Sequence, residues 1–297
     1  MADRQNDIRD DEFRVIGHAP KTDPPASDKK RRNLGVAIVS ALIVLAIGLL
    51  VIQNWPKGDM DDPAEGVFEN APVAAAPVEV KPLGAATDRT FTERLDTVIN
   101  DVRLSVYIPH NATPVLYVGN PNAEARKGIL AFQAADIRRD NRKILGAFVL
   151  KGQPLAWGLS KKGYCAIIDG RVTVGVSENS PLFEEATEKE GYFFRQYPLV
   201  DNGVLVENEP KNKTMRKALC SRAGQIIVVV SETDESFHDF SQALVDLGVE
   251  NAIYLVGSHS AFGWWRNETG AVEAFGIDDH RESFKNVSYI IWSNSSL

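Results

Sequence analysis

The sequence predicts an α+β fold: a mixed, largely antiparallel β-sheet with a few flanking helices, preceded by a single N-terminal transmembrane helix. Short apolar runs flank tight-turn signals, such as the Asp-Gly pair at 169–170 and the Asp-Asn-Gly turn at 201–203. Such signals between apolar runs are typical of β-hairpins. Residues 236–247 carry apolar side chains at helical spacing. Residues 34–52 form an uninterrupted apolar stretch, which is typical of a membrane span.

The predicted span at 34–52 contains 19 residues without a charge. As an α-helix it would extend about 28 Å, close to the hydrocarbon thickness of a bilayer. Basic residues at 29–32 precede it and Trp55 follows it, so the N-terminus is expected in the cytosol and the remainder outside. A buried core helix is rarely so uniformly apolar. A cleaved signal peptide rarely follows about 30 mostly charged residues.

Composition divides the chain into four parts. Residues 1–33 are charged and lack apolar periodicity, which predicts a disordered cytosolic tail. A Pro/Ala-rich linker at 53–87 follows the span at 34–52, and residues 88–297 form the folded domain. We expect a single-pass protein with this domain outside the cytoplasm, in a periplasm, on an inner-membrane anchor. A further hypothesis is that the tail binds a cytosolic partner.

The folded domain is expected to begin with a short helix at 91–101. A second helix at 236–247 has Ser236 as its N-cap and Gly248 just after its end. Two runs, 228–230 and 252–256, are continuously apolar, so we expect their strands to be buried on both faces. Strands are expected at 103–108, 115–118, 144–150, 164–168, 172–176, 199–206, 218–220, 226–230, 252–256 and 287–292.

Charge and cysteine content limit the partners. The chain of 297 residues has a formal net charge of −7 and no basic stripe with interleaved aromatics after residue 100, so no nucleic-acid partner is expected. Cys165 and Cys220 lie in strand-like runs on the predicted exported side. One disulfide and two buried thiols are both consistent with this placement. No Cys-x-x-Cys or Cys/His zinc spacing occurs, so no metal and no cofactor are expected.

Several segments of the domain follow one another in an order typical of a known family. They are AFQAAD at 131–136, ILGAFV at 144–149, Lys-Gly at 151–152, QYPLVDNG at 196–203, RKALC at 216–220, FSQALVDLG at 240–248 and NAIYLVGSHS at 251–260. In this order they resemble the phosphodiester glycosidase family. The resemblance covers roughly residues 100–297. It implies an enzyme acting on a sugar–phosphate or an envelope polysaccharide, so a carbohydrate or sugar-phosphate is the expected ligand.

Five positions depart from the family pattern. Val256 stands where the family has an aspartate, and Ser258 and His259 replace two glycines. Gln133 stands at an asparagine position, and Ala135 replaces a glycine. Side chains at glycine positions reshape a pocket, and valine cannot accept a proton. The departures therefore leave a second hypothesis beside the hydrolase: a catalytically inactive glycan-binding or envelope-assembly module of the same fold.

The resemblance also implies the residues of a site. Cleavage of a sugar–phosphate bond commonly requires acid and base groups, for which His259 and Asp136 are the candidates. Arg216 is the candidate phosphate ligand, because a guanidinium can make bidentate contacts to phosphate oxygens. The further candidate substrate-binding residues are Gln133, Asn202, Gly257, Ser258 and Ser260. Each also has a structural alternative, such as a capping aspartate or a loop histidine bonded to backbone.

Overall fold

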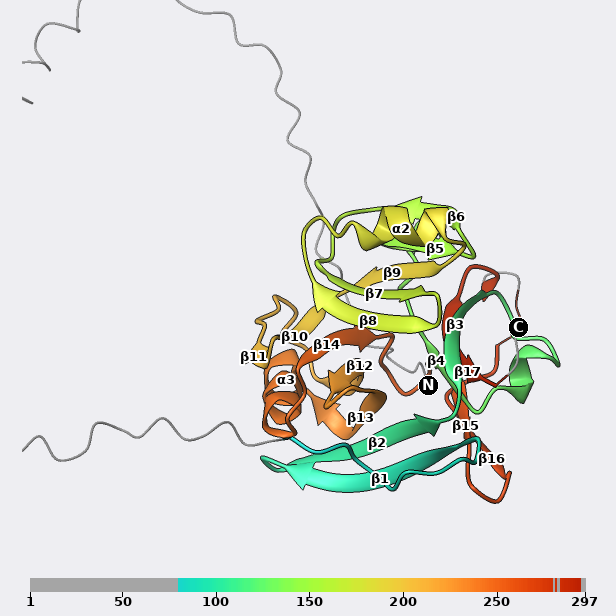
Figure 1. Ribbon diagram of the computed structural model, residues 1–297. Helices are drawn as coiled ribbons and strands as arrows, with labels where there is room; N and C mark the ends of the chain where they lie inside the picture. The colour runs from blue at the N-terminus through green and yellow to red at the C-terminus, as the bar shows by residue number, and fades with distance from the viewer. Residues whose placement is uncertain (1–79, 280, 282–283, 295–297) are drawn as a thin grey trace, which may run out of the picture. The chain divides into compact units, whose positions relative to one another are not determined.

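A computed structural model of the protein describes residues 80–279, 281 and 284–294 (Figure 1). The described residues belong to one compact unit. Its strands form one seven-stranded and two five-stranded sheets. Every strand pairing within the described residues is antiparallel.

The seven-stranded sheet forms the base of the domain. Its strands, in spatial order, are β1 (Phe91–Ile99), β2 (Val102–His110), β13 (Gln225–Glu235), β12 (Thr214–Arg222), β14 (Asn251–Leu255), β10 (Pro198–Asp201) and β11 (Val204–Leu205). Helix α3 (Phe237–Asp246) packs its apolar residues, including Phe240 and Leu244, against one face. Ser236 caps this helix by accepting a hydrogen bond from the backbone N–H of Asp239 at 3.0 Å, as predicted.

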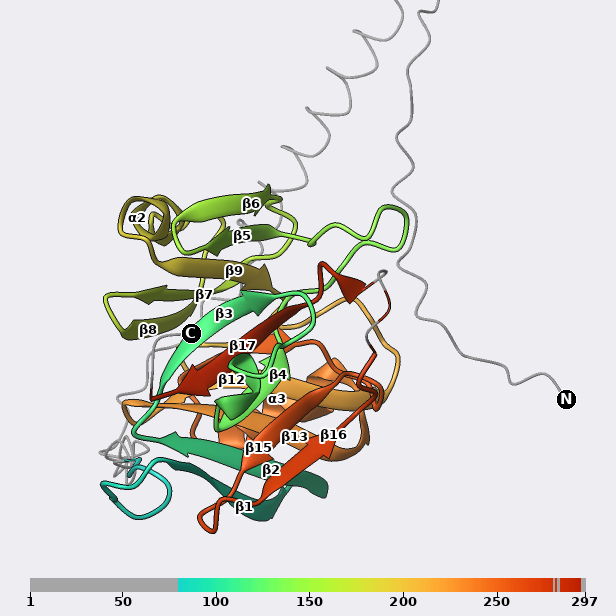
Figure 2. The same ribbon diagram turned by 90° about the vertical axis from the view of Figure 1, so that its right-hand side faces the viewer.

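The two five-stranded sheets complete the domain. The second sheet has the order β16 (Val272–Phe275), β15 (Gly263–Arg266), β4 (Leu130–Gln133), β17 (Ser288–Ser293) and β3 (Thr113–Val118), and the short 3-10 helix η1 (Ala125–Lys127) precedes β4. The third has the order β6 (Gln153–Trp157), β5 (Ala147–Leu150), β9 (Tyr192–Gln196), β7 (Gly163–Ile168) and β8 (Arg171–Val176). Helix α2 (Leu182–Glu188) covers the outer face of this third sheet. Figure 2 shows the second sheet toward the viewer, between the third sheet above and β1 and β2 below.

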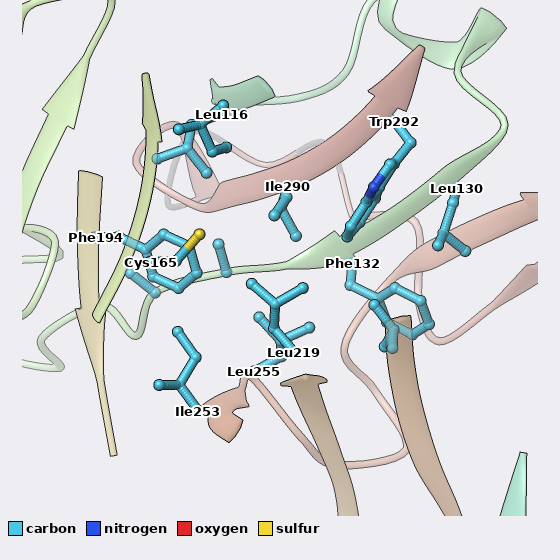
Figure 3. Close-up of a cluster of buried hydrophobic side chains, with 14 of the residues drawn as sticks. Leu116, Leu130, Phe132, Cys165, Phe194, Leu219, Ile253, Leu255, Ile290 and Trp292 are labelled. Carbon is cyan, nitrogen blue, oxygen red and sulfur yellow. The ribbon is translucent and has the colours of Figure 1, made fainter. Parts of the chain in front are cut away.

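The main core lies where the three sheets meet. Figure 3 shows Leu219 and Ile253 from the seven-stranded sheet, Phe132 and Trp292 from the second sheet, and Phe194 from the third. All five side chains are at most 1% exposed. The burial of apolar surface from every sheet in one cluster therefore holds the sheets together. The two cysteines are free buried thiols, Cys165 on β7 and Cys220 on β12.

The predicted fold class is wrong. The described part of the chain is predominantly β, with two short α-helices, and it contains no parallel strand pair that would make a sheet mixed. The predicted transmembrane helix at 34–52 lies outside the described residues. No helix among those that are described combines the length and the hydropathy needed to cross a bilayer.

The helix predicted at 91–101 is the main local error. These residues form β1, which pairs residue for residue with β2 from Phe91 opposite His110 to Ile99 opposite Val102. Asn100 and Asp101 both have positive φ, of 50° and 64°, and close a two-residue hairpin. The apolar spacing of this segment suggests a helix, but the continuous ladder to β2 decides the structure. Tertiary pairing therefore overrides the local pattern.

The last residues of the predicted linker pack on the domain. Leu83 exchanges two hydrogen bonds with the Gln225 side chain on β13, at 2.7 and 3.0 Å. The Arg222 guanidinium donates to the carbonyl oxygen of Lys81. The ordered contacts of the folded unit thus begin a few residues before residue 88.

Candidate functional site

The candidate site lies where the chain leaves β14. Residues 256–260, called the terminal loop below, follow this strand and contact the second sheet. The backbone N–H of Val256 donates to the carbonyl oxygen of Gln133, at the end of β4, at 3.1 Å. This bond joins the seven-stranded sheet to the second sheet. It brings together the first and the last of the motifs that resemble the family.

The segment after β4 is anchored from the far end of the sequence. The backbone N–H of Ala134 donates to the carbonyl oxygen of Ser288 on β17 at 2.9 Å. The backbone N–H of Ala135 donates to the Ser288 hydroxyl at 3.0 Å. Ser288 is fully buried. These bonds fix the backbone from which Asp136 extends.

Asp136 lies in a cluster of five residues, called the Asp136 cluster: Asp136, Lys161, Gln196, Tyr197 and Tyr254. The Lys161 ammonium binds Oδ2 of Asp136 and donates to Oε1 of Gln196 at 2.8 Å. The Gln196 amide donates to the same carboxylate oxygen at 3.1 Å. Lys161 Nζ also lies 4.4 Å from the centre of the Tyr197 ring. Lys161 is 3% exposed whereas Asp136 is 30% exposed, so a buried cation holds an accessible carboxylate.

Tyr254 connects this cluster to the terminal loop. Its hydroxyl oxygen accepts a hydrogen bond from the backbone N–H of Gly257 at 2.9 Å. Burial raises the pKa of Tyr254 to about 12, and the charge of Asp136 acts in the same direction. The residue after Val256 must be glycine here, because an added Cβ would lie 2.3 Å from the Tyr254 hydroxyl and 2.6 Å from the Met215 carbonyl oxygen.

Arg216 is on β12, and its guanidinium, including Nε, is bonded within the fold. The side chain is 2% exposed and lies over the Phe237 ring, 3.9 Å from its centre. Its Nε donates to the Glu235 carbonyl oxygen at 2.9 Å, and Nη2 donates to that of Asn212. Burial lowers the pKa of Arg216. These contacts give Arg216 a structural part in joining β12 to the start of α3.

The terminal loop presents polar groups to solvent. His259 is 66% exposed, and its Nε2 lies 2.9 Å from Oδ1 of Asp234. The hydroxyl oxygens of Ser258 and Ser260 are 3.0 Å apart. Ser258 has a φ of 69°, and its backbone N–H donates to the Met215 carbonyl oxygen at 3.1 Å. The loop therefore offers an imidazole and two hydroxyl groups.

The structure separates Asn202 and the Gln133 side chain from the Asp136 cluster. Asn202 is at the tip of the β10–β11 hairpin, where its backbone N–H donates to the Asn251 side chain at the start of β14. Gly257 follows the other end of β14, about 20 Å away at the usual rise of a strand. The Gln133 side chain bonds the buried Tyr289 hydroxyl, so it is held by β17.

Four members of the Asp136 cluster were not predicted from the sequence: Lys161, Gln196, Tyr197 and Tyr254. Gln196 and Tyr197 begin the QYPLVDNG segment, and Tyr254 lies within NAIYLVGSHS, so the motifs contain them without marking their roles. Lys161 belongs to no motif. It is one of two adjacent lysines in a loop, a pattern more typical of a solvated surface.

No protein-family model matches the sequence, and neither does any curated protein. Among solved structures, the fold is similar to the catalytic domain of zebrafish N-acetylglucosamine-1-phosphodiester alpha-N-acetylglucosaminidase, auto-inhibited by its pro-peptide. That match has 12% identity and a TM-score of 0.52, and it covers 73% of this chain and 87% of that one. A hypothetical protein from Synechocystis matches with 14% identity and a TM-score of 0.49, over 68% of this chain and 61% of that one. The described domain therefore has a distant fold relationship to a phosphodiester glycosidase catalytic domain.

Proposed function

We propose that the domain binds a carbohydrate, free or linked to phosphate, at the Asp136 cluster and the terminal loop. The observation that carries the proposal is the accessible carboxylate of Asp136, held by Lys161 and Gln196. His259 and Ser260 of the terminal loop are exposed, and Gly257 of the same loop donates to the Tyr254 hydroxyl. Sugar hydroxyls donate and accept hydrogen bonds, and this set of groups offers both partners. The distant fold relationship supports the same class of ligand.

Binding of a carbohydrate without its hydrolysis fits the geometry best. Hydrolysis of a glycosidic bond commonly uses two carboxylates in separate roles. Here Asp136 is paired with Lys161, and Asp234 is paired with His259. Val256 stands at the family aspartate, and Arg216 is buried against backbone carbonyls. We therefore favour a glycan-binding module over a hydrolase.

Hydrolysis of a sugar phosphodiester is the second candidate, favoured by the exposure of Asp136. A carboxylate fixed by two donors on one oxygen keeps its other oxygen for a substrate. In this hypothesis Asp136 acts as the base or nucleophile and His259 as the acid. The location of the domain outside the cytoplasm stays a prediction from the sequence.

Binding can be tested by saturation-transfer NMR on the full-length protein. The probes are the methyl diester of N-acetylglucosamine 1-phosphate and a set of neutral and acidic oligosaccharides. Asp136→Asn should weaken binding of the responding probe by about tenfold, the value of one hydrogen bond to a charged group. Asp201→Asn, on the distant β10–β11 hairpin, is the matched control. Equal binding by wild type and Asp136→Asn would rule out this site.

Hydrolysis needs a separate assay on a panel of sugar 1-phosphodiesters. The second candidate predicts turnover that is lost in Asp136→Asn and reduced in His259→Ala. If no member of the panel is hydrolysed while binding is retained, only the glycan-binding hypothesis remains. The variant Val256→Asp restores the residue of the family pattern. A gain of hydrolysis in this variant would identify the domain as a decayed enzyme.

A further inference from the structure

A groove lies away from the Asp136 cluster, on the outer face of the third sheet. It has a volume of about 470 Å³ and lies between edge strand β6 and the start of α2. Its walls are mainly aromatic and aliphatic, and its lining includes Trp157, Leu159, Pro181, Phe183, Glu184 and Arg195. Its volume is in the range of small-molecule sites, which are typically apolar with a few polar groups.

The apolar wall of this groove is exposed. Trp157 is 67% exposed and Leu159 is 65% exposed. Gly158 lies between them and packs directly on Gly146, since an added Cβ would be 3.2 Å from the Gly146 Cα. The backbone that carries the two side chains is thus fixed against the sheet. Large apolar side chains held rigidly in solvent beside a groove are typical of a binding surface.

The floor of the groove contains a buried positive charge. Arg195 is 2% exposed, and its Nη1 donates to the carbonyl oxygens of Lys161 and Ser177 at 2.8 and 2.7 Å. Its Nη2 donates to that of Glu178 at 2.8 Å. Its Nε is buried and has no hydrogen-bond partner. Buried donors are almost always satisfied, so an unpaired Nε is unusual.

The charge of Arg195 is also not neutralised by an ion pair. The three acceptors are backbone carbonyls, which carry no net charge. In the part of the chain that the structure describes, Arg195 forms these bonds to carbonyl oxygens and no ion pair with a carboxylate. Burial lowers the pKa of Arg195, and the more distant Tyr164 and Glu184 act in the opposite direction. A buried cation without a counter-ion favours an anionic ligand.

The groove is separate from the proposed glycan site. Arg195 and Gln196 are consecutive on β9, so their side chains point to opposite faces of the sheet. Gln196 bonds Asp136 on the inner face, whereas Arg195 lines the groove on the outer face. Lys161 connects the two, with its carbonyl oxygen on Arg195 and its ammonium on Asp136.

We propose that this groove binds a small ligand with a flat apolar face and one anionic group. The apolar face lies on Trp157 and Leu159, and the anion is directed toward Arg195. Two kinds of molecule share this chemistry: an aryl or alkyl carboxylate, and an acidic sugar residue that presents the apolar face of its ring. The proposal rests on the groove alone and does not depend on the proposed function.

The test uses the full-length protein, with isothermal titration calorimetry and tryptophan fluorescence. The probes are 4-phenylbutyrate with its neutral amide, and methyl glucuronide with methyl glucoside. Binding of an acid should quench tryptophan emission and be at least about tenfold tighter than binding of its neutral partner. Binding of phenylbutyrate would identify an aryl or alkyl carboxylate as the class of ligand, and binding of methyl glucuronide would identify an acidic sugar. No binding of either acid, or equal affinity for acid and neutral partner, overturns the proposal.

Variants locate the binding. Trp157→Ala should weaken binding of the responding acid by about tenfold. Leu155→Ala is the matched control, because Leu155 is exposed on the same strand but does not line the groove. Trp157 and Leu155 are both exposed, so the two variants should fold. An Arg195 variant is not used, because it would leave three backbone carbonyl oxygens without their donor. Unchanged affinity in Trp157→Ala would overturn the site. Asp136→Asn should leave this affinity unchanged, which separates a failure here from a failure of the proposed glycan site.

Discussion

The ammonium group of Lys217 donates a hydrogen bond to the carbonyl oxygen of Ala261 at 3.1 Å, from a side chain only 2% exposed. The same group lies 3.3 Å from the Ser258 carbonyl oxygen and 5.0 Å from the centre of the Phe275 ring. Lys217 and Arg216 are adjacent on β12 and buried on opposite faces of it. One basic side chain thus supports the terminal loop, and the other supports the start of α3.

Burial of Lys217 predicts a pH-dependent stability. Desolvation lowers its pKa from 10.5 to about 8 in the folded protein. Between these values the unfolded chain binds more protons, so the free energy of unfolding should rise as the pH increases from about 8 to about 10.5. The rise should be roughly 3 kcal/mol relative to the variant Lys217→Met. Urea denaturation of both proteins across this range measures it. A difference that is constant with pH would contradict the prediction.

The Lys161–Asp136 pair predicts coupled effects on stability. Lys161→Met removes the ammonium group that pairs with Asp136 and donates to Gln196, and it should lower the free energy of unfolding by about 2–4 kcal/mol. Asp136→Asn should cost less, and the double variant should cost at least about 1 kcal/mol less than the sum. Chemical denaturation gives all three values. Lys162→Met is the control, because Lys162 pairs with Glu178 at the surface and should change stability by under about 0.5 kcal/mol. Additive effects would argue against the pair.

The backbone of Ser258 predicts a position-specific effect in the terminal loop. Its φ of 69° is unfavourable for β-branched residues. We expect Ser258→Val to lower the free energy of unfolding by about 1–2 kcal/mol. Ser260→Val, two residues away and exposed, should have an effect near zero. Thermal unfolding of the two variants compares them directly, and equal losses at both positions would show that backbone strain is not the cause.

The two thiols predict a simple chemical test. Cys165 and Cys220 are both fully buried, and burial raises the pKa of each thiol far above its ordinary value. Neither should react with Ellman's reagent in the native protein, and both should react once urea unfolds it. The measurement is absorbance at increasing urea concentration. Fast reaction in native buffer would show that one of these strands opens, and no reaction after unfolding would indicate a disulfide.

The sequence predicted the central strands and α3, because their signals are local. The β7–β8 and β10–β11 turns contain an Asp-Gly and an Asn-Gly pair, and α3 has both of its ends marked by Ser236 and Gly248. The segment 91–99 contains neither such a turn pair nor a helix cap that would indicate its structure. Its structure depends on a partner strand that sets the register across the whole of β1.

The candidate site was predictable only in part, for a related reason. His259 and Asp136 lie within motifs. The groups that hold Asp136 come from residues 25 and 60 positions further along the chain. Local spacing carries no information about such contacts. For Arg216 the difficulty is the opposite one. Its chemistry suits phosphate binding, but the side chain is buried against Phe237 of α3.

The bonds from Ala134 and Ala135 to Ser288 set the order in which this domain can mature. They join two residues to one about 153 positions further along the chain, across most of the folded unit. Closure of so long a loop is entropically costly and slow. During synthesis, Asp136 leaves the ribosome early but can be fixed only after β17 has been made. The proposed glycan site should therefore be among the last parts of the protein to form, and binding at it would report completed folding.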